Sequence, residues 1–326
     1  MTTARAVAAG LARSLASSRV IDLSHPIEAS TPHSPHHAPF QMALLRRHGD
    51  TLREGGLSGA NELITMGAHT ATHIDALSHI SLNGRLHGGH DATEAQRGGR
   101  FGVLGAETIS PLLGRGVLLN VADHLGAGPE GLPPGYAITA ADLESAAQAA
   151  DVRVEDGDTV FVRTGWATTR YAEPGRYIGW ETGVPGPDLS AARWLSARGV
   201  VATGTDTAAY EVLAPGAGHA RLPVHGHLLG EAGTHLIEQA ALDELAAHGA
   251  PVFALIAVPL RIVGATGSPL RPLALLPVSA GERLRIRGLR GAAPEATKEG
   301  ERDMSTMSFG KKITDVYIID QRSASG

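Results

Sequence analysis

The sequence predicts an α/β fold, because helix and strand signals alternate through its middle. Thr139 and Asp142 resemble a capping box that opens a helix running to about residue 150, and the β-branched run 159–162 then predicts a strand. Two further helices end at a glycine and lead into apolar strands: 189–198 with Gly199 and 200–202, then 242–248 with Gly249 and 252–258. Alternation of this kind is typical of helices packed on a sheet, and by itself it favours a doubly wound sheet.

Composition excludes several classes of function. The chain has 326 residues, 43% of them hydrophobic, with 28 basic and 33 acidic residues and a net charge of −5. Because no Lys/Arg run breaks the mixture, we expect no nucleic-acid partner. No apolar stretch reaches the ~18 uninterrupted residues of a membrane span, so we expect no membrane insertion. The first residues favour a short amphipathic helix over a transit or signal peptide, and cytoplasmic residence is the default expectation.

One stretch of eleven residues concentrates chemically useful side chains. His69, His73, Asp75 and His79 bring three imidazoles and a carboxylate together in a chain without cysteine. This is a ligand set for a divalent metal such as Zn²⁺ or Mn²⁺, which accepts imidazole nitrogen and carboxylate oxygen without needing thiolate. The alternative is that some of the sixteen histidines are ordinary surface or core residues. Four donors at this spacing favour a metal site.

Regular structure cannot bring all four of these side chains together. On one continuous strand, residues 69 and 79 would lie roughly 33 Å apart, and on one helix Asp75 and His79 would face away from His69 and His73. A turn from His69 to His73, followed by an extended step to Asp75, would converge three of the groups. His79 would then lie nearby without being a ligand.

These residues carry a family resemblance. The pattern H-x-x-x-H-x-D-x-x-x-H resembles the motif H-x-G-T-H-x-D-x-P-x-H of the metal-dependent cyclase and kynurenine formamidase family, which includes isatin hydrolase and putative polyketide cyclases. Ala71 replaces the motif glycine, and Leu77 replaces the motif proline. Both differences affect the shape of the backbone and leave the ligand set intact.

A second segment extends the resemblance. Residues 224–238 resemble the family's second metal segment, in which a His after Val and a Glu at the end of an apolar run face the ion; His225 fits this pattern better than His227. Residues 20–27 and 258–269 are similar to further family segments. The resemblance therefore covers roughly residues 19–278.

The resemblance implies a fold, a site and an assembly. It implies a swivelling β/β/α fold with a central barrel-like mixed sheet flanked by helices, in a homodimer or homotetramer. The implied cofactor is a divalent metal, Zn or Mn. The implied ligands are His69, His73, Asp75, His225 and Glu238, with His79 as the general acid/base and Glu238 able to share that catalytic role.

The implied function is metal-dependent hydrolysis of a small-molecule substrate. The bond would be an amide, formamide, lactam or lactone of a cyclic or aromatic compound, cleaved by metal-activated water with His79 moving the proton. The first alternative is a cyclase or dehydratase acting on a polyketide-like intermediate, since a Lewis acid and a base also serve enolisation. The second alternative is a binding module that has lost activity, against which the presence of both metal segments argues.

The domain organisation follows from the extent of the resemblance. We expect an N-terminal helix or arm at 1–18, a catalytic domain at 19–290 and a polar C-terminal tail or arm at 291–326, in which 313–320 is an edge strand or swapped arm. A Gly/Pro/aromatic-rich stretch from Ala167 to Pro187, with Trp166 beside it, either packs an irregular loop or forms a substrate lid or subunit contact.

Other polar residues are weaker candidates. His87 and His90 follow the metal motif closely enough to be considered as substrate contacts, whereas the cluster His33, His36 and His37 is interpreted as a proline-rich loop. Asp206 and Glu211 belong either to a segment near the active site or to a capping group and a surface ion pair.

Overall fold

Nine strands form one mixed sheet within residues 2–278, the part of the chain that this computed structural model describes. In spatial order the strands are β1 (Ser18–Asp22), β15 (Leu273–Pro277), β13 (Val252–Ala257), β7 (Leu112–Asn120), β9 (Thr159–Arg163), β11 (Ala202–Thr205), β12 (His235–Glu238), β4 (His73–Asp75) and β14 (Gly267–Pro269).

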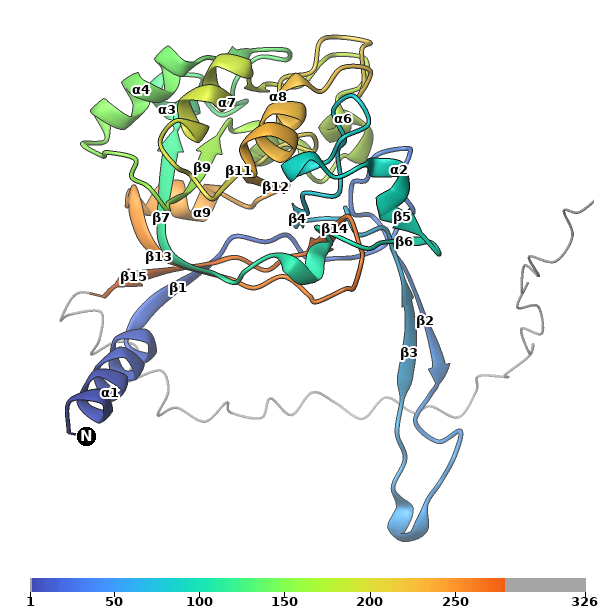
Figure 1. Cartoon of the computed structure of the whole chain (residues 1–326). Helices are drawn as coiled ribbons and strands as arrows, with labels where there is room; N and C mark the ends of the chain where they lie inside the picture. The colour runs from blue at the N-terminus through green and yellow to red at the C-terminus, as the bar shows by residue number, and fades with distance from the viewer. Residues whose placement is uncertain (1, 279–326) are drawn as a thin grey trace, which may run out of the picture. The chain divides into compact units, whose positions relative to one another are not determined.

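The pairing directions correct the doubly wound sheet that periodicity alone favours. Only β7, β9, β11 and β12 run parallel, whereas β13, β15 and β1 on one side and β4 and β14 on the other pair antiparallel. The sheet curls into a half-barrel flanked by helices, which agrees with the barrel-like fold class implied by the resemblance (Figure 1).

The predicted helix and strand pairs are present. Helix α4 (Ala140–Ala149) has the reciprocal capping box of Thr139 and Asp142, and Gly249 ends helix α9 (Asp243–His248) in the left-handed conformation. Helix α7 (Leu189–Ser196) ends three residues before Gly199. The strand predicted at 200–202 was placed too early: pairing starts only at Ala202, opposite Thr159.

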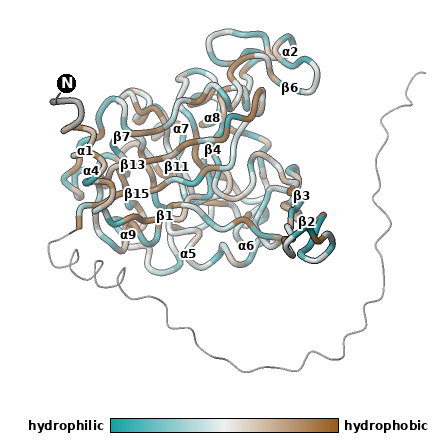
Figure 2. Tube along the Cα trace, turned by 90° about the horizontal axis from the view of Figure 1, so that it is seen from below, coloured by the Kyte–Doolittle hydropathy of each residue, from teal (hydrophilic) through white to brown (hydrophobic). Residues whose placement is uncertain are grey.

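The central strands are buried on both faces. Alternate residues of β7 show this most clearly: Val117 and Leu119 pack with α4 and α7 in one cluster, while Leu118 packs in a second cluster with Leu245 of α9. Figure 2 shows that hydrophobic colouring also extends along the antiparallel strands β13 and β15. Parallel strands that are covered on both faces have continuously apolar sequences. This is why the sequence predicts these strands clearly.

The remaining elements surround this sheet. They are the helices α1 (Thr2–Ala16), α2 (Ala92–Ala95), α3 (Val121–His124), α5 (Trp166–Arg170), α6 (Pro174–Ile178) and α8 (Pro223–His225), a π-helical turn (Gly226–Ala232), 3₁₀ turns at Glu54–Gly56, His87–Gly89 and Ala106–Thr108, and the strand pairs β2 (Gln41–Arg46) with β3 (Asn61–Thr65), β5 (Gln96–Arg97) with β6 (Arg100–Phe101), and β8 (Ala137–Ile138) with β10 (Gly186–Pro187).

Two further expectations concern membrane insertion and the C-terminal tail. Among the described residues, no helix is both long and apolar enough to span a membrane. The predicted tail at 291–326, with its strand or arm at 313–320 and the boundary before it, lies outside the described residues.

Candidate metal centre

Strand β4 presents two of the predicted ligands on one face. His73 and Asp75 alternate with Ile74, which is fully buried in the hydrophobic core on the opposite face. The preceding residues form the turn that the spacing required, so the turn and extended step bring His69 back to Asp75. His69 Nδ1 lies 2.7 Å from Asp75 Oδ1.

The backbone conformation of this turn shows why the family motif has a glycine where this chain has Ala71. Ala71 stands at the motif glycine and adopts a positive φ of 53°. This left-handed conformation costs an L-residue roughly 1–2 kcal/mol, whereas glycine adopts it readily. The chain keeps the turn in spite of the alanine, and the carbonyl of Ala71 accepts a hydrogen bond from His73 Nδ1 at 2.8 Å. That bond leaves His73 Nε2 free to face the other predicted metal ligands, which are called the cluster below.

The second metal segment reaches the first through strand pairing. Glu238 of β12 lies directly opposite His73 of β4 in the antiparallel ladder. Directly opposed residues point to the same face of a sheet, and Glu238 Oε2 lies 3.4 Å from His73 Nε2. The pairing of β12 with β4 therefore brings residues from distant parts of the chain into contact.

The segment 258–269 supports the first histidine from the other side. Gly267 of β14 pairs with Asp75, and a Cβ added at Gly267 would lie 2.7 Å from Cε1 of His69. A side chain at this position would displace the imidazole, so glycine is required for close packing. Thr266 Oγ1 lies 2.9 Å from His69 Nε2, which directs Nδ1 toward Asp75.

His225 comes from helix α8, immediately before the π-helical turn. Its Nδ1 lies 2.7 Å from the buried carboxylate of Glu211, which also accepts the backbone N–H groups of Val224 and His225. Nε2 of His225 therefore faces the cluster, 3.2 Å from Glu238 and 3.9 Å from Asp75. Glu211 is thus a buried partner of a predicted ligand, which favours the first of its two sequence interpretations.

All five predicted ligands and His79 converge around Asp75. His69, Asp75 and His79 each offer a ligand atom within 4.8 Å of the others, and so do Asp75, His225 and Glu238. His73 Nε2 lies between the two groups, 3.5 Å from Asp75 and 3.4 Å from Glu238. His79 lies within ligand range, although the sequence analysis placed it near the metal as a base only.

The cluster fits a divalent cation. Within the described residues, the buried polar atoms that lack a hydrogen-bond partner include His73 Nε2, both carboxylate oxygens of Asp75, and Glu238 Oε1. Unpaired buried polar atoms are costly, and several of them directed at one point indicate a missing ligand. Imidazole nitrogen and carboxylate oxygen are ligands for Zn²⁺ and Mn²⁺ but do not decide between them.

The pKa shifts show how strongly the carboxylates attract positive charge. Burial opposes ionisation of Asp75, but His79 and His69 hold the pKa of this carboxyl well below its usual range. Burial also opposes the charged form of His225, yet the nearby carboxylates of Glu211 and Glu238 raise the pKa of this imidazole to about 10. A cation takes over the charge balance that these protons provide, so metal binding releases protons.

His79 differs from the other histidines. Burial lowers the pKa of His79 to about 4, although Asp75 opposes this effect. The sequence expectation used the ordinary value of about 6.5. Its ring lies 4.1 Å from that of His69 and 6.4 Å from that of His225, measured between centroids. The imidazole is therefore neutral at pH 7 and available to accept a proton at the edge of the cluster.

A rim of rings that the sequence analysis missed surrounds the cluster. The His37 ring lies 5.2 Å from that of His69, so the proline-rich histidine segment reaches the site. Trp180 stacks on His219 at 5.9 Å and meets His36 edge-on at 5.5 Å. Burial lowers the pKa of His219, opposed by Glu238. A weak signal was available, since His36 and His37 stand out in a loop and Trp180 in the aromatic stretch.

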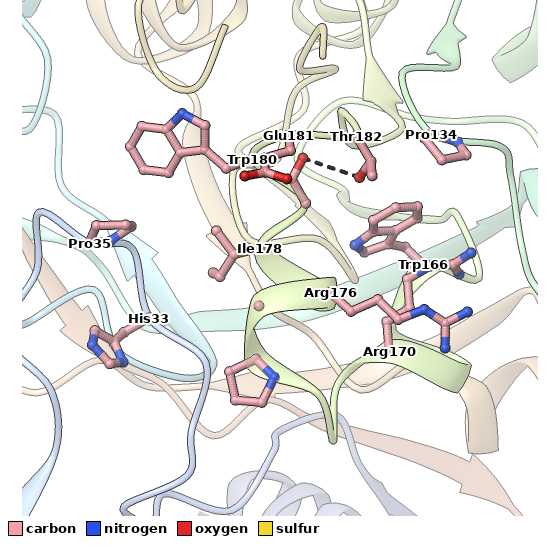
Figure 3. Close-up of a pocket in the computed structure, with 13 residues that line it drawn as sticks. His33, Pro35, Pro134, Trp166, Arg170, Arg176, Ile178, Trp180, Glu181 and Thr182 are labelled. Carbon is pink, nitrogen blue, oxygen red and sulfur yellow. Dashed lines mark hydrogen bonds between the residues drawn. The ribbon is translucent and has the colours of Figure 1, made fainter. Parts of the chain in front are cut away.

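The aromatic stretch packs its own loop, which is the first of its two predicted roles. Trp166 and Tyr177 are fully buried and pack the loop. Trp180 is half-buried and lines a cavity of about 750 Å³, in which Figure 3 shows Trp180, Pro35 and His33 on one side and Trp166 on the other. None of the predicted metal ligands lines this cavity. Trp180 connects the two features, because its ring also contacts the rim of the metal centre.

The remaining polar residues considered in the sequence do not belong to the cluster of metal ligands. His87 Nδ1 faces the carbonyl of Gly230, and His90 is exposed. Asp206 is buried and accepts hydrogen bonds from the backbone and hydroxyl of Thr164. His227 pairs with exposed Glu231, consistent with the choice of His225 as the candidate ligand.

The chain belongs to the cyclase family: a family model described as "Putative cyclase" matches residues 21–212, more than half of its length. It is 31% identical to isatin hydrolase of Roseibium aggregatum over 217 residues, which are 66% of this chain and 74% of that protein. The structure matches a crystal structure described as a novel cyclase, with TM-score 0.72, 30% identity, and coverage of 84% of this chain and 93% of that one.

Isatin hydrolase A from Ralstonia solanacearum is a further structural neighbour, with TM-score 0.62, 26% identity, and coverage of 85% and 98%. Family membership, the hydrolase relatives and the donor cluster together support an enzyme with a metal-dependent, hydrolase-type function in general terms.

Removing a ligand side chain tests the metal assignment. Asp75→Asn and His73→Ala should each leave the protein without its metal ion, because each removes a buried donor directed at the cluster. Metal content is measured by elemental analysis after dialysis, with His90→Ala as the control that keeps the ion. Normal metal content in both ligand variants would refute the assignment.

The support given by Glu211 has a matched control in the same chain. Glu211→Gln should lower metal affinity by about 10- to 100-fold, because the buried carboxylate orients His225. Glu231→Gln removes a carboxylate that contacts His227 at the same distance of 2.7 Å but lies on the surface, and should leave affinity unchanged. Titration against a competing chelator measures both, and equal losses would contradict a specific role for Glu211.

Proposed function

We propose that this protein is a metal-dependent hydrolase that cleaves the amide, formamide, lactam or lactone bond of a small cyclic or aromatic compound. The observation that carries the proposal is the set of buried polar atoms on His73, Asp75 and Glu238 that make no hydrogen bond within the described residues and lie together in one cluster. The relatives named isatin hydrolase support the choice of bond, since isatin is a cyclic amide fused to an aromatic ring. The half-buried ring of Trp180 at the rim is compatible with a planar substrate.

The residues that would hold the ion are His69, His73, Asp75, His225 and Glu238. Bound there, a divalent ion supplies Lewis-acid chemistry, polarising a carbonyl and lowering the pKa of water from ~15.7 toward ~7. The carboxylates of Asp75 and Glu238 are ionised in their surroundings, because neighbouring imidazoles lower the pKa of both groups against the effect of burial. They therefore provide the negative charge that retains a cation.

His79 is the proposed general acid/base. Its imidazole is neutral at pH 7, so it can accept a proton from the attacking water and return that proton to the leaving nitrogen or oxygen. Glu238 can share the proton transfer, since its carboxylate lies at the edge of the same cluster.

A second candidate function is metal-assisted cyclisation or dehydration of a polyketide-like intermediate. It is supported by the description of the matching family as putative cyclases. The same base and the same cation site would serve proton abstraction next to a carbonyl. Hydrolysis and cyclisation differ in one measurable way, because only hydrolysis adds solvent oxygen to the product.

An isotope experiment separates the two candidates. The protein reconstituted with Zn²⁺ or Mn²⁺ should open isatin or a related lactam, lactone or formamide, and in ¹⁸O-water the new carboxylate should gain one heavy oxygen, as measured by mass spectrometry. Metal-free Asp75→Asn protein is the negative control. Product without solvent oxygen would support cyclisation, and a metal-loaded protein that opens none of these bonds would refute the hydrolase proposal.

The role of His79 is tested separately from metal binding. His79→Ala should keep its metal and lose about 10²- to 10⁴-fold in kcat, the usual contribution of general acid/base catalysis. His87→Ala, which removes a half-buried imidazole outside the cluster, is the control for turnover and metal content. Loss of the metal would make His79 a ligand, and unchanged turnover would remove it from the mechanism.

A further inference from the structure

A serine, a histidine and a glutamate form a chain of hydrogen bonds outside the metal centre. Ser196 is the last residue of helix α7, whereas His227 and Glu231 lie in the π-helical turn Gly226–Ala232. Ser196 Oγ lies 2.9 Å from Nε2 of His227, and Nδ1 of the same imidazole lies 2.7 Å from Oε2 of Glu231. The packing of α7 against the π-helical turn therefore aligns three side chains from two separate segments.

The contact with the glutamate fixes which imidazole nitrogen carries the proton. An ionised carboxylate only accepts hydrogen bonds, so the nitrogen that faces Glu231 is protonated. Nε2 of His227 then has a lone pair for the hydroxyl of Ser196, whose only other recorded contact, with the carbonyl oxygen of Arg193, is longer at 3.2 Å. The same order of hydroxyl, imidazole and carboxylate activates the nucleophile of serine hydrolases, where geometry identifies it and position in the sequence does not.

A pocket beside Ser196 provides space for a small substrate. It has a volume of about 390 Å³, and Ser196 lies in its wall together with two glycines, Gly199 and Gly233, and two further hydroxyl residues, Thr108 and Ser110. This volume is at the lower end of the range of small-molecule sites. None of the five predicted metal ligands lines the pocket. A molecule bound there would lie next to the serine hydroxyl and away from the metal centre.

The two histidines of this segment have different partners, although only one residue separates them. His225 contacts carboxylates of the metal centre, whereas His227 contacts Ser196 and Glu231. The side chain of His227 is 16% exposed, against 4% for that of His225. The two imidazoles therefore belong to separate sites, one buried and one open to solvent.

We propose that Ser196, His227 and Glu231 form a second hydrolytic site, which takes short-chain esters and works without the metal ion. Ser196 Oγ attacks the carbonyl carbon of the ester while its proton passes to Nε2 of His227. The bond to the alcohol oxygen then breaks, the alcohol leaves with that proton, and the acyl group remains on Ser196. Water that gives a proton to the same imidazole hydrolyses this acyl group, which releases the carboxylic acid and restores the serine hydroxyl. Glu231 stabilises the imidazolium that forms in both steps.

The chain contains a matched control for this arrangement. Ser145 Oγ lies 2.8 Å from Nε2 of His124, a serine–histidine contact of nearly the same length. Among the residues that the structure describes, no carboxylate pairs with His124. Ser145 is also exposed, whereas Ser196 is half-buried, so greater access to a reagent would favour Ser145. A faster reaction of Ser196 would therefore come from its imidazole and carboxylate partners.

The experiment measures covalent labelling of the full, metal-loaded chain by a fluorophosphonate, which forms a bond to an activated serine oxygen as fluoride leaves. Mass spectrometry of the peptides identifies the labelled residue and gives its rate. Ser196 should be labelled much faster than Ser145, and the rate should be the same after a chelator has removed the metal. His227→Gln should lower the rate at Ser196 by about 10²-fold or more, because the general base is lost. Glu231→Gln should also lower it, since an amide does not stabilise the imidazolium.

A second measurement tests turnover. The chelator-treated protein should release p-nitrophenol from p-nitrophenyl acetate, and Ser196→Ala should lose this release while keeping its circular dichroism spectrum, because alanine is well tolerated at the end of a helix. Labelling of Ser145 as fast as that of Ser196 would overturn the proposal. So would an unchanged rate at Ser196 in His227→Gln, or a folded wild-type protein in which Ser196 takes no label.

Discussion

The structure depends on the position of β4 between β12 and β14. Its antiparallel ladders place Glu238 beside His73 and Gly267 beside Asp75. These backbone hydrogen bonds fix imidazole and carboxylate groups in the protein interior, where an uncompensated charge costs several kcal/mol. The apolar side chains of Ile74 and Ile237, on the opposite face, pack in the hydrophobic core and hold the two strands together. Stability and chemistry are thus divided between the two faces of a very short strand.

The environment of each histidine sets its role. His225 lies between the carboxylates of Glu211 and Glu238. It can therefore carry a positive charge itself or, as a neutral imidazole, help to bind a metal cation there. His79 is buried without an aligned carboxylate partner among the described residues, and its neutral form is favoured. The same side chain therefore serves as a candidate ligand in one place and as a candidate base in another. Burial and neighbouring charge produce this difference, and residue type alone does not.

The first ligand segment of the metal centre follows directly on the exposed β2–β3 hairpin, an arm over residues 41–65. The backbone of Gly67, just after β3, donates a hydrogen bond to the carbonyl of Ala38, just before β2. This bond closes the base of the arm next to His37 and His69, whose rings contact each other.

Local sequence patterns were enough to predict the α/β class, the helices with clear caps and the first group of residues at the candidate metal centre. The capping box at Thr139 and the glycine at 249 are local signals, and the spacing of His69, His73 and Asp75 constrains the backbone within a few residues. The resemblance to a known family supplied His225 and Glu238, because no local rule relates them to the first segment.

How distant segments meet became visible only in the folded chain. The sheet is mixed, the strand after Gly199 begins two residues later than predicted, and His37, His219 and Trp180 form the rim of the site. The arm at 41–65 had no distinctive signal in the sequence, because its apolar residues resemble those of an ordinary buried hairpin. Strand pairing and solvent exposure depend on contacts between residues far apart in the chain, and the pattern of a single segment does not contain that information.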